Sequence, residues 1–310
     1  MSLSVLLGQI LVIFLEIGVG FIAAETGILS DGGSKTLSGL IMAVTLPCTL
    51  LASTNVPAGG DTVLRMLIAL VVIEVFFILC AVICLGIAKK TGCTPAQKAV
   101  LITLTVLPNS TFVGMPLTAA ILGEETGMIY VAAGMIAYNL FFFTYSTHLF
   151  QPDKRLTLKT FLTPANLATA AMIVMLVSGL HFAGPLQNFV SAVGGCTTPL
   201  ALMVVGVMLA QSDLKEVFKN RFLYGMTFLR CIVFPLALMA VLHLTGMDDV
   251  LSMGVVILAA CPCGSLGAVL AKQQDMEPHL AGQAVAQSTL ASVVTIPLVL
   301  LTAGKLFGIG

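Results

Sequence analysis

Charged residues are scarce in this chain: Asp, Glu, Lys and Arg make up 9% of its 310 residues, whereas about a quarter of a soluble domain is charged. Hydrophobic residues make up 58%. This composition excludes an ordinary soluble domain and predicts a polytopic protein of the lipid bilayer. Because 14 basic residues balance 14 acidic ones, no positive excess supports nucleic-acid binding, and we expect no partner of that class.

Signals for metals, disulfides and cofactors are also missing. Cys261-x-Cys263 has no second Cys or His pair at the spacing of metal ligands, and no glycine-rich phosphate loop is present. Four other cysteines lie in apolar runs, where thiols pack as small hydrophobes: Cys48, Cys80, Cys84 and Cys231. We therefore expect no disulfide framework, no metal site and no cofactor.

Ten apolar runs are long enough to cross the ~30 Å hydrocarbon core of a bilayer, and turn or charged residues separate them. The runs cover residues 3–25, 34–54, 62–88, 95–122, 126–150, 165–183, 187–210, 220–244, 249–272 and 278–304. The sequence therefore predicts an all-α polytopic membrane protein with ten transmembrane helices. The first run lacks the basic start of a signal peptide, so we expect it to remain as the first helix.

Basic residues gather in alternate loops. With the N-terminus outside, the inside loops hold eleven of the 14 basic residues: Lys35, Lys89, Lys90, Lys98, Lys154, Arg155, Lys159, Lys215, Lys219, Arg221 and Lys272. Arg65, Arg230 and Lys305 fall elsewhere. The positive-inside rule then predicts that both termini lie on the outer side of the cell membrane.

The two halves of the chain carry matching landmarks. Pro47 and Pro199 lie 152 residues apart, and Pro108 and Pro262 lie 154 residues apart. The similar offsets predict two five-helix repeats, residues 1–155 and 156–310. An odd number of spans inverts the second copy, an arrangement typical of transporters with paired broken helices. The alternative is a coincidence, since prolines are common in membrane helices.

Residues 107–117 read LPNSTFVGMPL, which puts two prolines and a glycine inside an apolar run. Proline removes a backbone donor and clashes with the preceding turn, so we expect helix breaks at Pro108 and at Pro262. In lipid, a broken backbone is tolerated only where protein or a water-lined cavity receives it. Both breaks therefore indicate an interior site.

These residues 107–117 resemble the fourth-helix motif of the auxin efflux carrier family, which includes plant PIN proteins and bacterial carriers of malonate-like acids. Further stretches are similar to the family's seventh, ninth and tenth helices: Thr198–Leu202 with Gly206–Leu209, Pro262 with Leu270–Lys272, and Ser288–Leu290. The resemblance covers nearly the whole chain in the family's order.

The resemblance implies a homodimeric, elevator-type carrier of organic anions with a fold like that of the bile-acid sodium symporters. Helices 1, 2, 6 and 7 would form the scaffold and the dimer contact, and helices 3–5 and 8–10 the mobile transport domain. The anion would bind near the crossing of helices 4 and 9. Two departures stand out: the link at residues 151–164 is short, and Leu266 stands where bacterial relatives often carry an asparagine.

An anion within a bilayer needs hydrogen-bond donors and positive potential, and the N-termini of the half-helices after the two breaks supply both. The candidate binding residues are Asn109, Ser110 and Thr111 after the first break, Cys261, Cys263, Gly264 and Ser265 around the second, and Tyr138 and Asn139 from the fifth helix. Gly114 and Gly267 would let the crossing backbones approach. Alternatively, Asn109 only caps its half-helix, and Asn139 only joins two helices.

Three charged residues lie within the apolar runs, namely Glu16, Glu74 and Arg230, and such residues are functional by default. We expect Glu74 to couple transport to protons, with Arg230 as its partner or as a countercharge for the substrate. The alternatives are a static ion pair and an Arg230 that extends to the inner face. Glu16 is expected to be structural.

The sequence thus predicts a secondary transporter of small organic anions, auxin-like or mono- and dicarboxylates, that works by alternating access as a uniporter or with protons. A sodium-coupled symporter of the bile-acid type is the nearest alternative, followed by a channel or membrane sensor. An intramembrane hydrolase would pair Ser110 or Ser265 with a histidine, but no histidine is expected at mid-membrane. We therefore expect that the protein is not an enzyme.

Overall fold

A computed structural model describes residues 3–52, 54, 60–152, 162–211 and 217–309 of the chain. Within these ranges the protein consists of helices and turns, and the one strand-like feature is a single backbone bridge. The prediction of an all-α protein is therefore confirmed for this part of the chain.

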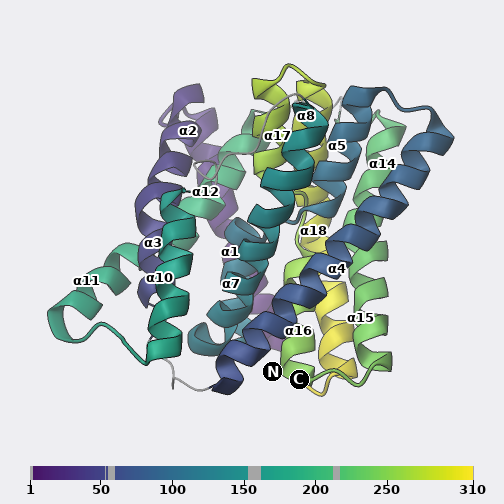
Figure 1. Cartoon of the computed structure of the whole chain (residues 1–310). Helices are drawn as coiled ribbons and strands as arrows, with labels where there is room; N and C mark the ends of the chain where they lie inside the picture. Colours follow the sequence, from purple (N-terminus) through teal and green to yellow (C-terminus); the bar gives the residue numbers. More distant parts are fainter. Residues whose placement is uncertain (1–2, 53, 55–59, 153–161, 212–216, 310) are drawn as a thin grey trace.

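The helices are bounded as follows, with η marking π-helical segments (Figure 1). The first half holds α1 (Leu3–Glu25), α2 (Asp31–Leu40), η1 (Ile41–Thr45), α3 (Leu46–Ala52), α4 (Gly60–Thr91), α5 (Pro95–Val106), η2 (Ser110–Gly114), α6 (Met115–Leu122), α7 (Glu124–Phe141), η3 (Phe142–Ser146) and α8 (Thr147–Phe150). The second half holds α10 (Pro164–Ser178), α11 (Gly184–Gly195), α12 (Thr197–Ala210), α14 (Arg221–Phe228), η4 (Leu229–Val233), α15 (Phe234–Leu244), α16 (Asp249–Ala260), α17 (Ser265–Gln273) and α18 (Pro278–Leu306).

Six helical stretches of the described chain are long and apolar enough to cross a membrane: Lys35–Ala52, Asp61–Thr91, Glu125–Phe150, Gly184–Val207, Arg221–Leu244 and Pro278–Leu306. Three shorter apolar helices accompany them, Ser110–Leu122, Pro164–Met175 and Asp249–Ala260. The start of α1 and the end of α18 lie at the same end of the bundle (Figure 1). The count of ten spans and their inverted repeat stay predictions.

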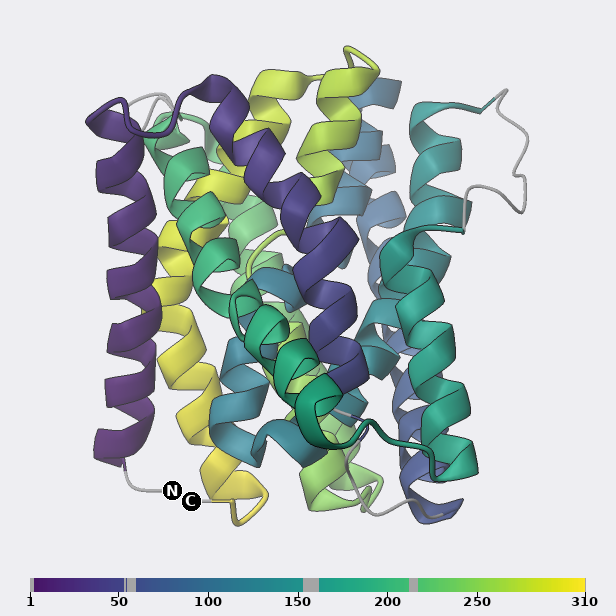
Figure 2. The ribbon, with the colours of Figure 1, turned by 90° about the vertical axis from the view of Figure 1, so that its left-hand side faces the viewer.

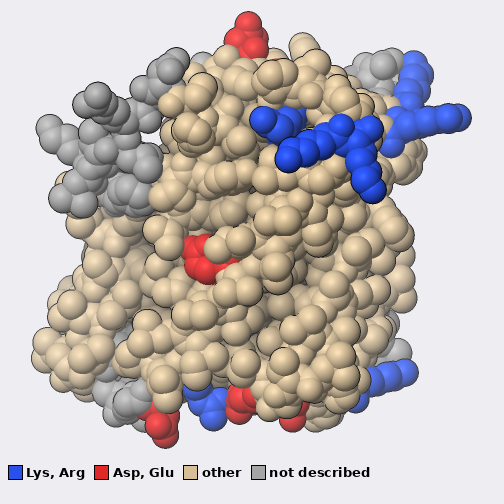
Figure 3. Space-filling view, turned by 45° about the vertical axis from the view of Figure 1, so that its right-hand side comes forward, with Lys and Arg blue, Asp and Glu red and all other residues tan. Residues whose placement is uncertain are grey.

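Charged side chains gather at the two ends of the bundle (Figure 3). On the face shown, most Lys and Arg side chains cluster near the upper end, acidic and basic side chains both lie at the lower end, and the surface between is uncharged apart from one acidic group. Such a band is the surface that the hydrocarbon core of a bilayer requires.

The closest helix packing falls within two groups. In the first, α12 contacts α1 and α2, and α3 contacts α10 and α11. In the second, α4 packs on α5 and α7, while α18 packs on α14, α16 and α17. Figure 2 views the molecule from the side of the first group.

Two glycines bring α1 and α12 into backbone contact. A Cβ atom added at Gly20 would lie 2.0 Å from the carbonyl oxygen of Met203, and one added at Gly206 would lie 1.9 Å from that of Ile17. Helices in lipid associate through such close van der Waals contact, which small residues permit.

Four π-helical segments interrupt the helices, and three of them end two residues before a proline: η1 precedes Pro47, η2 precedes Pro116 and η4 precedes Pro235. Proline lacks a backbone N–H, and its ring clashes with the carbonyl four residues earlier. The preceding turn widens to relieve this clash. Such segments are frequent at functional sites.

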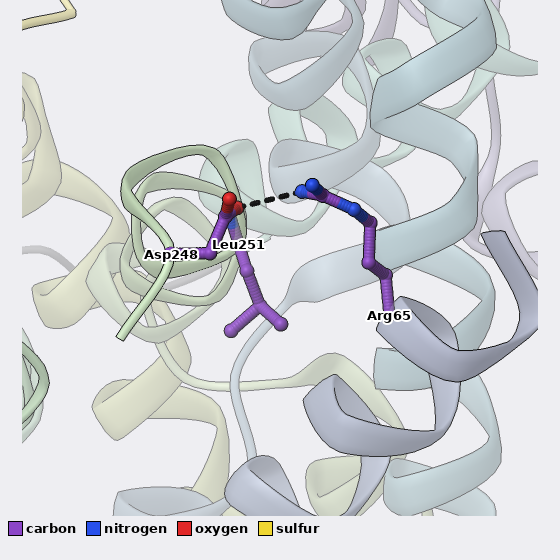
Figure 4. A network of polar contacts seen from close by, with 3 residues as sticks. All are labelled: Arg65, Asp248 and Leu251. Atoms are coloured by element: carbon purple, nitrogen blue, oxygen red, sulfur yellow. Dashed lines mark hydrogen bonds and ion pairs between the residues drawn. The ribbon is translucent and has the colours of Figure 1, made fainter. Parts of the chain in front are cut away.

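An ion pair joins the start of α4 to the start of α16 (Figure 4). Arg65 Nη1 lies 2.8 Å from Asp248 Oδ1, and the same oxygen accepts a 2.9 Å hydrogen bond from the backbone N–H of Leu251. An exposed pair of this kind contributes little free energy. We expect the cap on α16 to matter more for stability than the pair.

The contact between α1 and α12 gives a first prediction. Gly20→Ala is expected to lower the free energy of unfolding by roughly 1–3 kcal/mol, because overpacking forces the backbones apart. The melting temperature of the purified protein in detergent measures this. Gly18→Ala on the same helix is the control, since a Cβ there has nothing within 4 Å. Equal melting temperatures for the two variants would contradict the close contact.

Candidate functional site

The two expected helix breaks lie against each other at the centre of the bundle. Helix α5 ends at Val106 and η2 begins at Ser110, while α16 ends at Ala260 and α17 begins at Ser265. The backbone N–H of Asn109 donates to the carbonyl of Pro262 at 2.7 Å, and that of Gly264 donates to the carbonyl of Leu107 at 2.9 Å. These bonds form an antiparallel bridge between Pro108 and Cys263.

Proline chemistry explains why the chain leaves the helix at these points. The residue before a proline is pushed out of the helical region, and Leu107 (φ −89°, ψ 117°) and Cys261 (φ −66°, ψ 150°) are both extended. Extended backbone exposes groups that a membrane interior must satisfy. Here each break supplies hydrogen-bond partners for the other.

Asn109 caps the half-helix after the first break and keeps a free donor. Its Oδ1 accepts a 3.3 Å hydrogen bond from the backbone N–H of Phe112, which fixes which end of the amide is oxygen. Its Nδ2 is buried and has no hydrogen-bond partner. Capping and ligand binding are therefore compatible, because they use different atoms of one side chain.

Ser288 of α18 supplies a hydrogen-bond acceptor for the backbone at the second break. Its Oγ accepts a 3.1 Å hydrogen bond from the backbone N–H of Cys263 and donates to the carbonyl of Val285 at 3.1 Å. The sequence marked Ser288 only as part of a motif. Its role was missed because its partner is a backbone group 25 residues away.

A cavity of about 320 Å³ adjoins the crossing. None of the residues that line it in the described part of the chain is charged. Its lining comprises Met42, Pro108, Asn109, Ser110, Thr111, Phe112, Met135, Tyr138, Asn139, Phe142, Phe143, Thr147, Gln151, Thr163, Ala165, Gly264, Ser265, Leu266, Val269 and Leu270. Amide and hydroxyl groups near the breaks thus face an apolar, partly aromatic wall.

The cavity brings together most of the residues expected from the sequence. Asn109, Ser110, Thr111, Tyr138, Asn139, Gly264 and Ser265 all line it, as does Pro108. Cys261 and Cys263 are fully buried outside the lining, and the Cys261 thiol donates to the carbonyl of Ile257. Thr147, Gln151 and Thr163 also line the cavity, although no sequence pattern singled them out.

Glycines let each broken helix receive side chains of the other. A Cβ at Gly114 would lie 3.0 Å from Leu258 Cδ2 in α16, and one at Gly267 would lie 2.6 Å from Leu104 Cδ2 in α5. A Cβ at Gly264 would lie 2.9 Å from the hydroxyl of Tyr138. At Gly114 and Gly267, therefore, the backbone of one broken helix lies close to a side chain of the other.

Helix α7 contributes Tyr138 and Asn139 to the cavity wall. The ring of Tyr138 stacks on that of Phe142, with centroids 5.9 Å apart and an angle of 22° between the planes. Asn139 Nδ2 donates to Asn166 Oδ1 of α10. Asn139 therefore joins two helices in addition to lining the cavity.

Arg230 does not pair with Glu74. Its side chain is fully buried, and its guanidinium donates to the backbone carbonyls of Thr105, Val106, Ala259 and Cys261. Arg65 and Asp248 form an ion pair, whereas Arg230 bonds to carbonyls and Glu74 Oε1 has no hydrogen-bond partner. The expected pairing is therefore wrong, and so is the alternative in which Arg230 extends to the inner face. Equal depth in the membrane does not make two side chains face each other.

Comparison with known proteins points to a transporter family. The sequence matches the model of a family described as membrane transport protein, over residues 5–159 and 153–300. It is also similar to an uncharacterized transporter of Methanothermobacter thermautotrophicus, with 22% identity over 297 residues that cover 90% of this chain and 92% of that protein.

The cap on the second break gives a second prediction. Ser288→Ala is expected to lower the free energy of unfolding by roughly 1–3 kcal/mol, because the N–H of Cys263 is left buried without an acceptor. Ser292→Ala is the matched control: Ser292 is also buried, and its hydroxyl donates to the carbonyl of Thr289 in its own helix. A Ser288→Ala variant that melts no lower than the control would contradict the role of this cap.

Proposed function

Because the chain belongs to the membrane transport protein family, that of the auxin efflux and PIN-like carriers, we propose that it is a secondary transporter of small organic anions. It is an integral membrane protein. The proposed substrates are auxin-like acids or mono- and dicarboxylates.

One observation carries the proposal: the Nδ2 group of Asn109 is a buried donor without a partner, beside the cavity at the crossing. A buried polar group left unpaired costs free energy, so a ligand acceptor is the natural partner for it. The first residues of η2 and α17, Ser110 and Ser265, both line the cavity, and helix N-termini favour negative charge. A carboxylate supplies both the acceptor and the charge.

The rest of the cavity suits the organic part of such an acid. Its volume of about 320 Å³ lies at the small end of the range for ligand pockets. The aromatic side chains of Phe112, Tyr138, Phe142 and Phe143 line it. Selectivity for small acids with an apolar portion follows from this wall.

For transport we propose an elevator-type mechanism in a fold of two inverted repeats, in which a mobile transport domain moves against a scaffold and two copies of the chain contact each other through their scaffolds. The two groups of closely packed helices support this division, since α4–α8 with α14–α18 would move against α1–α3 with α10–α12. The hydrogen bond from Asn139 to Asn166 crosses between these groups. It would have to break during the movement, and both termini would lie outside the cell.

Binding of an anion can be tested by thermal shift with acetate, malonate, succinate and indole-3-acetate as probes. We expect at least one to raise the melting temperature, and Asn109→Ala to weaken its binding roughly 10- to 100-fold, the effect of losing a donor to a charged group. Asn220→Ala is the matched control, because Asn220 also caps a helix, through the N–H of Phe222. A wild-type protein that no acid stabilises would contradict the proposed function.

Glu74 is the proposed proton carrier, because its Oε1 is buried without a hydrogen-bond partner. Uptake of the acid identified above into proteoliposomes is expected to accelerate with an inward proton gradient, and Glu74→Gln is expected to remove that dependence. Glu16→Gln should retain it. Loss of the gradient effect in both variants, or in neither, would contradict the role of Glu74, and uptake driven by sodium would favour the bile-acid type of symporter.

A further inference from the structure

Arg230 is the one charged side chain that is fully buried in the described part of the chain. It lies in η4, where the turn widens ahead of Pro235. It is not among the residues that line the cavity. Its position therefore requires an explanation other than direct contact with a ligand there.

The guanidinium of Arg230 lies between the carbonyl ends of two helices. Nη1 donates to Val106 at 2.8 Å and to Thr105 at 3.3 Å, at the end of α5. Nε donates to Cys261 at 3.1 Å, and Nη2 donates to Ala259, at the end of α16. The last carbonyls of a helix have no partner within it, and here one cation satisfies those of both helices.

The positive charge of Arg230 balances the partial negative charges at the C-terminal ends of α5 and α16. Each helix C-terminus carries about half a negative charge, so two of them together balance about one positive charge. All three guanidinium nitrogens take part, which a lysine ammonium on its single nitrogen would not reproduce. The fixed cation thus neutralises the carbonyl ends, and the N-termini of η2 and α17 remain as the uncompensated, positive ends at the cavity.

In transporters with discontinuous helices, carbonyls at half-helix ends and in unwound backbone form the sites that bind sodium. We propose that Arg230 is a built-in cation that occupies such a carbonyl site, so that this carrier binds no sodium there. The inference rests on the proposed function as an anion carrier and adds that its anion site needs no metal cation. Arg230 is in this sense a positioning residue, which acts through the two helix ends.

The test is a comparison of melting temperatures in sodium chloride and in choline chloride at equal ionic strength. The wild-type protein is expected to melt at the same temperature in both salts. Arg230→Ala is expected to melt roughly 10 °C lower, because four buried carbonyls lose a charged donor. Its melting temperature should rise, in a saturable way, with sodium or with methylguanidinium at concentrations far below those that denature proteins.

Arg230→Met is the matched control, since its side chain fills the space without charge. It should melt lower than the wild type and gain nothing from either cation. A merely structural role of Arg230 predicts lower melting for both variants and sodium rescue of neither. If the two variants do not fold, Arg230→Lys retains a charge and should melt equally in both salts.

Three results would overturn the proposal: a wild-type protein that sodium stabilises over choline, an Arg230→Ala variant that neither cation rescues, and an Arg230→Lys variant that gains sodium dependence. The assay contains no carboxylate. A failure of the protein to bind any acid would therefore count against the proposed function alone. It would not change the result of the melting comparison that tests the role of Arg230.

Discussion

Two backbone hydrogen bonds hold the centre of this protein, one from Asn109 to Pro262 and one from Gly264 to Leu107. Each joins groups that a continuous helix would have paired internally. Unpaired backbone groups cost several kcal/mol each within a membrane, by common estimates, so neither break could persist at this depth without the other. The placement of α5, η2, α16 and α17, and of the helices packed on them, depends on this exchange.

Three side chains complete the exchange: two of them accept from backbone N–H groups, and the third donates to backbone carbonyls. Asn109 accepts from the N–H of Phe112, Ser288 accepts from that of Cys263, and Arg230 donates to the carbonyl ends. Donors and acceptors are thereby separated in space. Carbonyls are satisfied from within the protein, whereas one amide donor stays free beside the cavity. The polarity of the cavity follows from this separation more than from any charge in its wall.

Part of this fold and of its central crossing could be predicted from the chemistry of the residues. Proline forbids a regular helix at Pro108 and Pro262 wherever they fall, and apolar composition forces helices in lipid, so the breaks and the helical fold could be predicted. The partners of Arg230 could not, because carbonyl ends belong to the backbone and leave no mark in residue type. The predicted ion pair between Glu74 and Arg230 is wrong because the spacing between the two residues gives their depth in the membrane. It does not give the direction in which each side chain points from its helix. Ser288 was missed for the same reason as Arg230, since its partner is a main-chain N–H.

The bridge at the crossing pairs Pro108 with Cys263, not with Pro262. In this antiparallel register Asn109, with its amide, lies opposite Pro262, and Gly264 lies opposite Leu107, so no second amide faces Asn109 across the crossing. The two sides of the crossing are thus chemically unequal even though both are broken at proline. A dicarboxylate with identical ends would meet the amide of Asn109 at one end alone, so its own symmetry would give it no advantage over an acid with a single carboxylate.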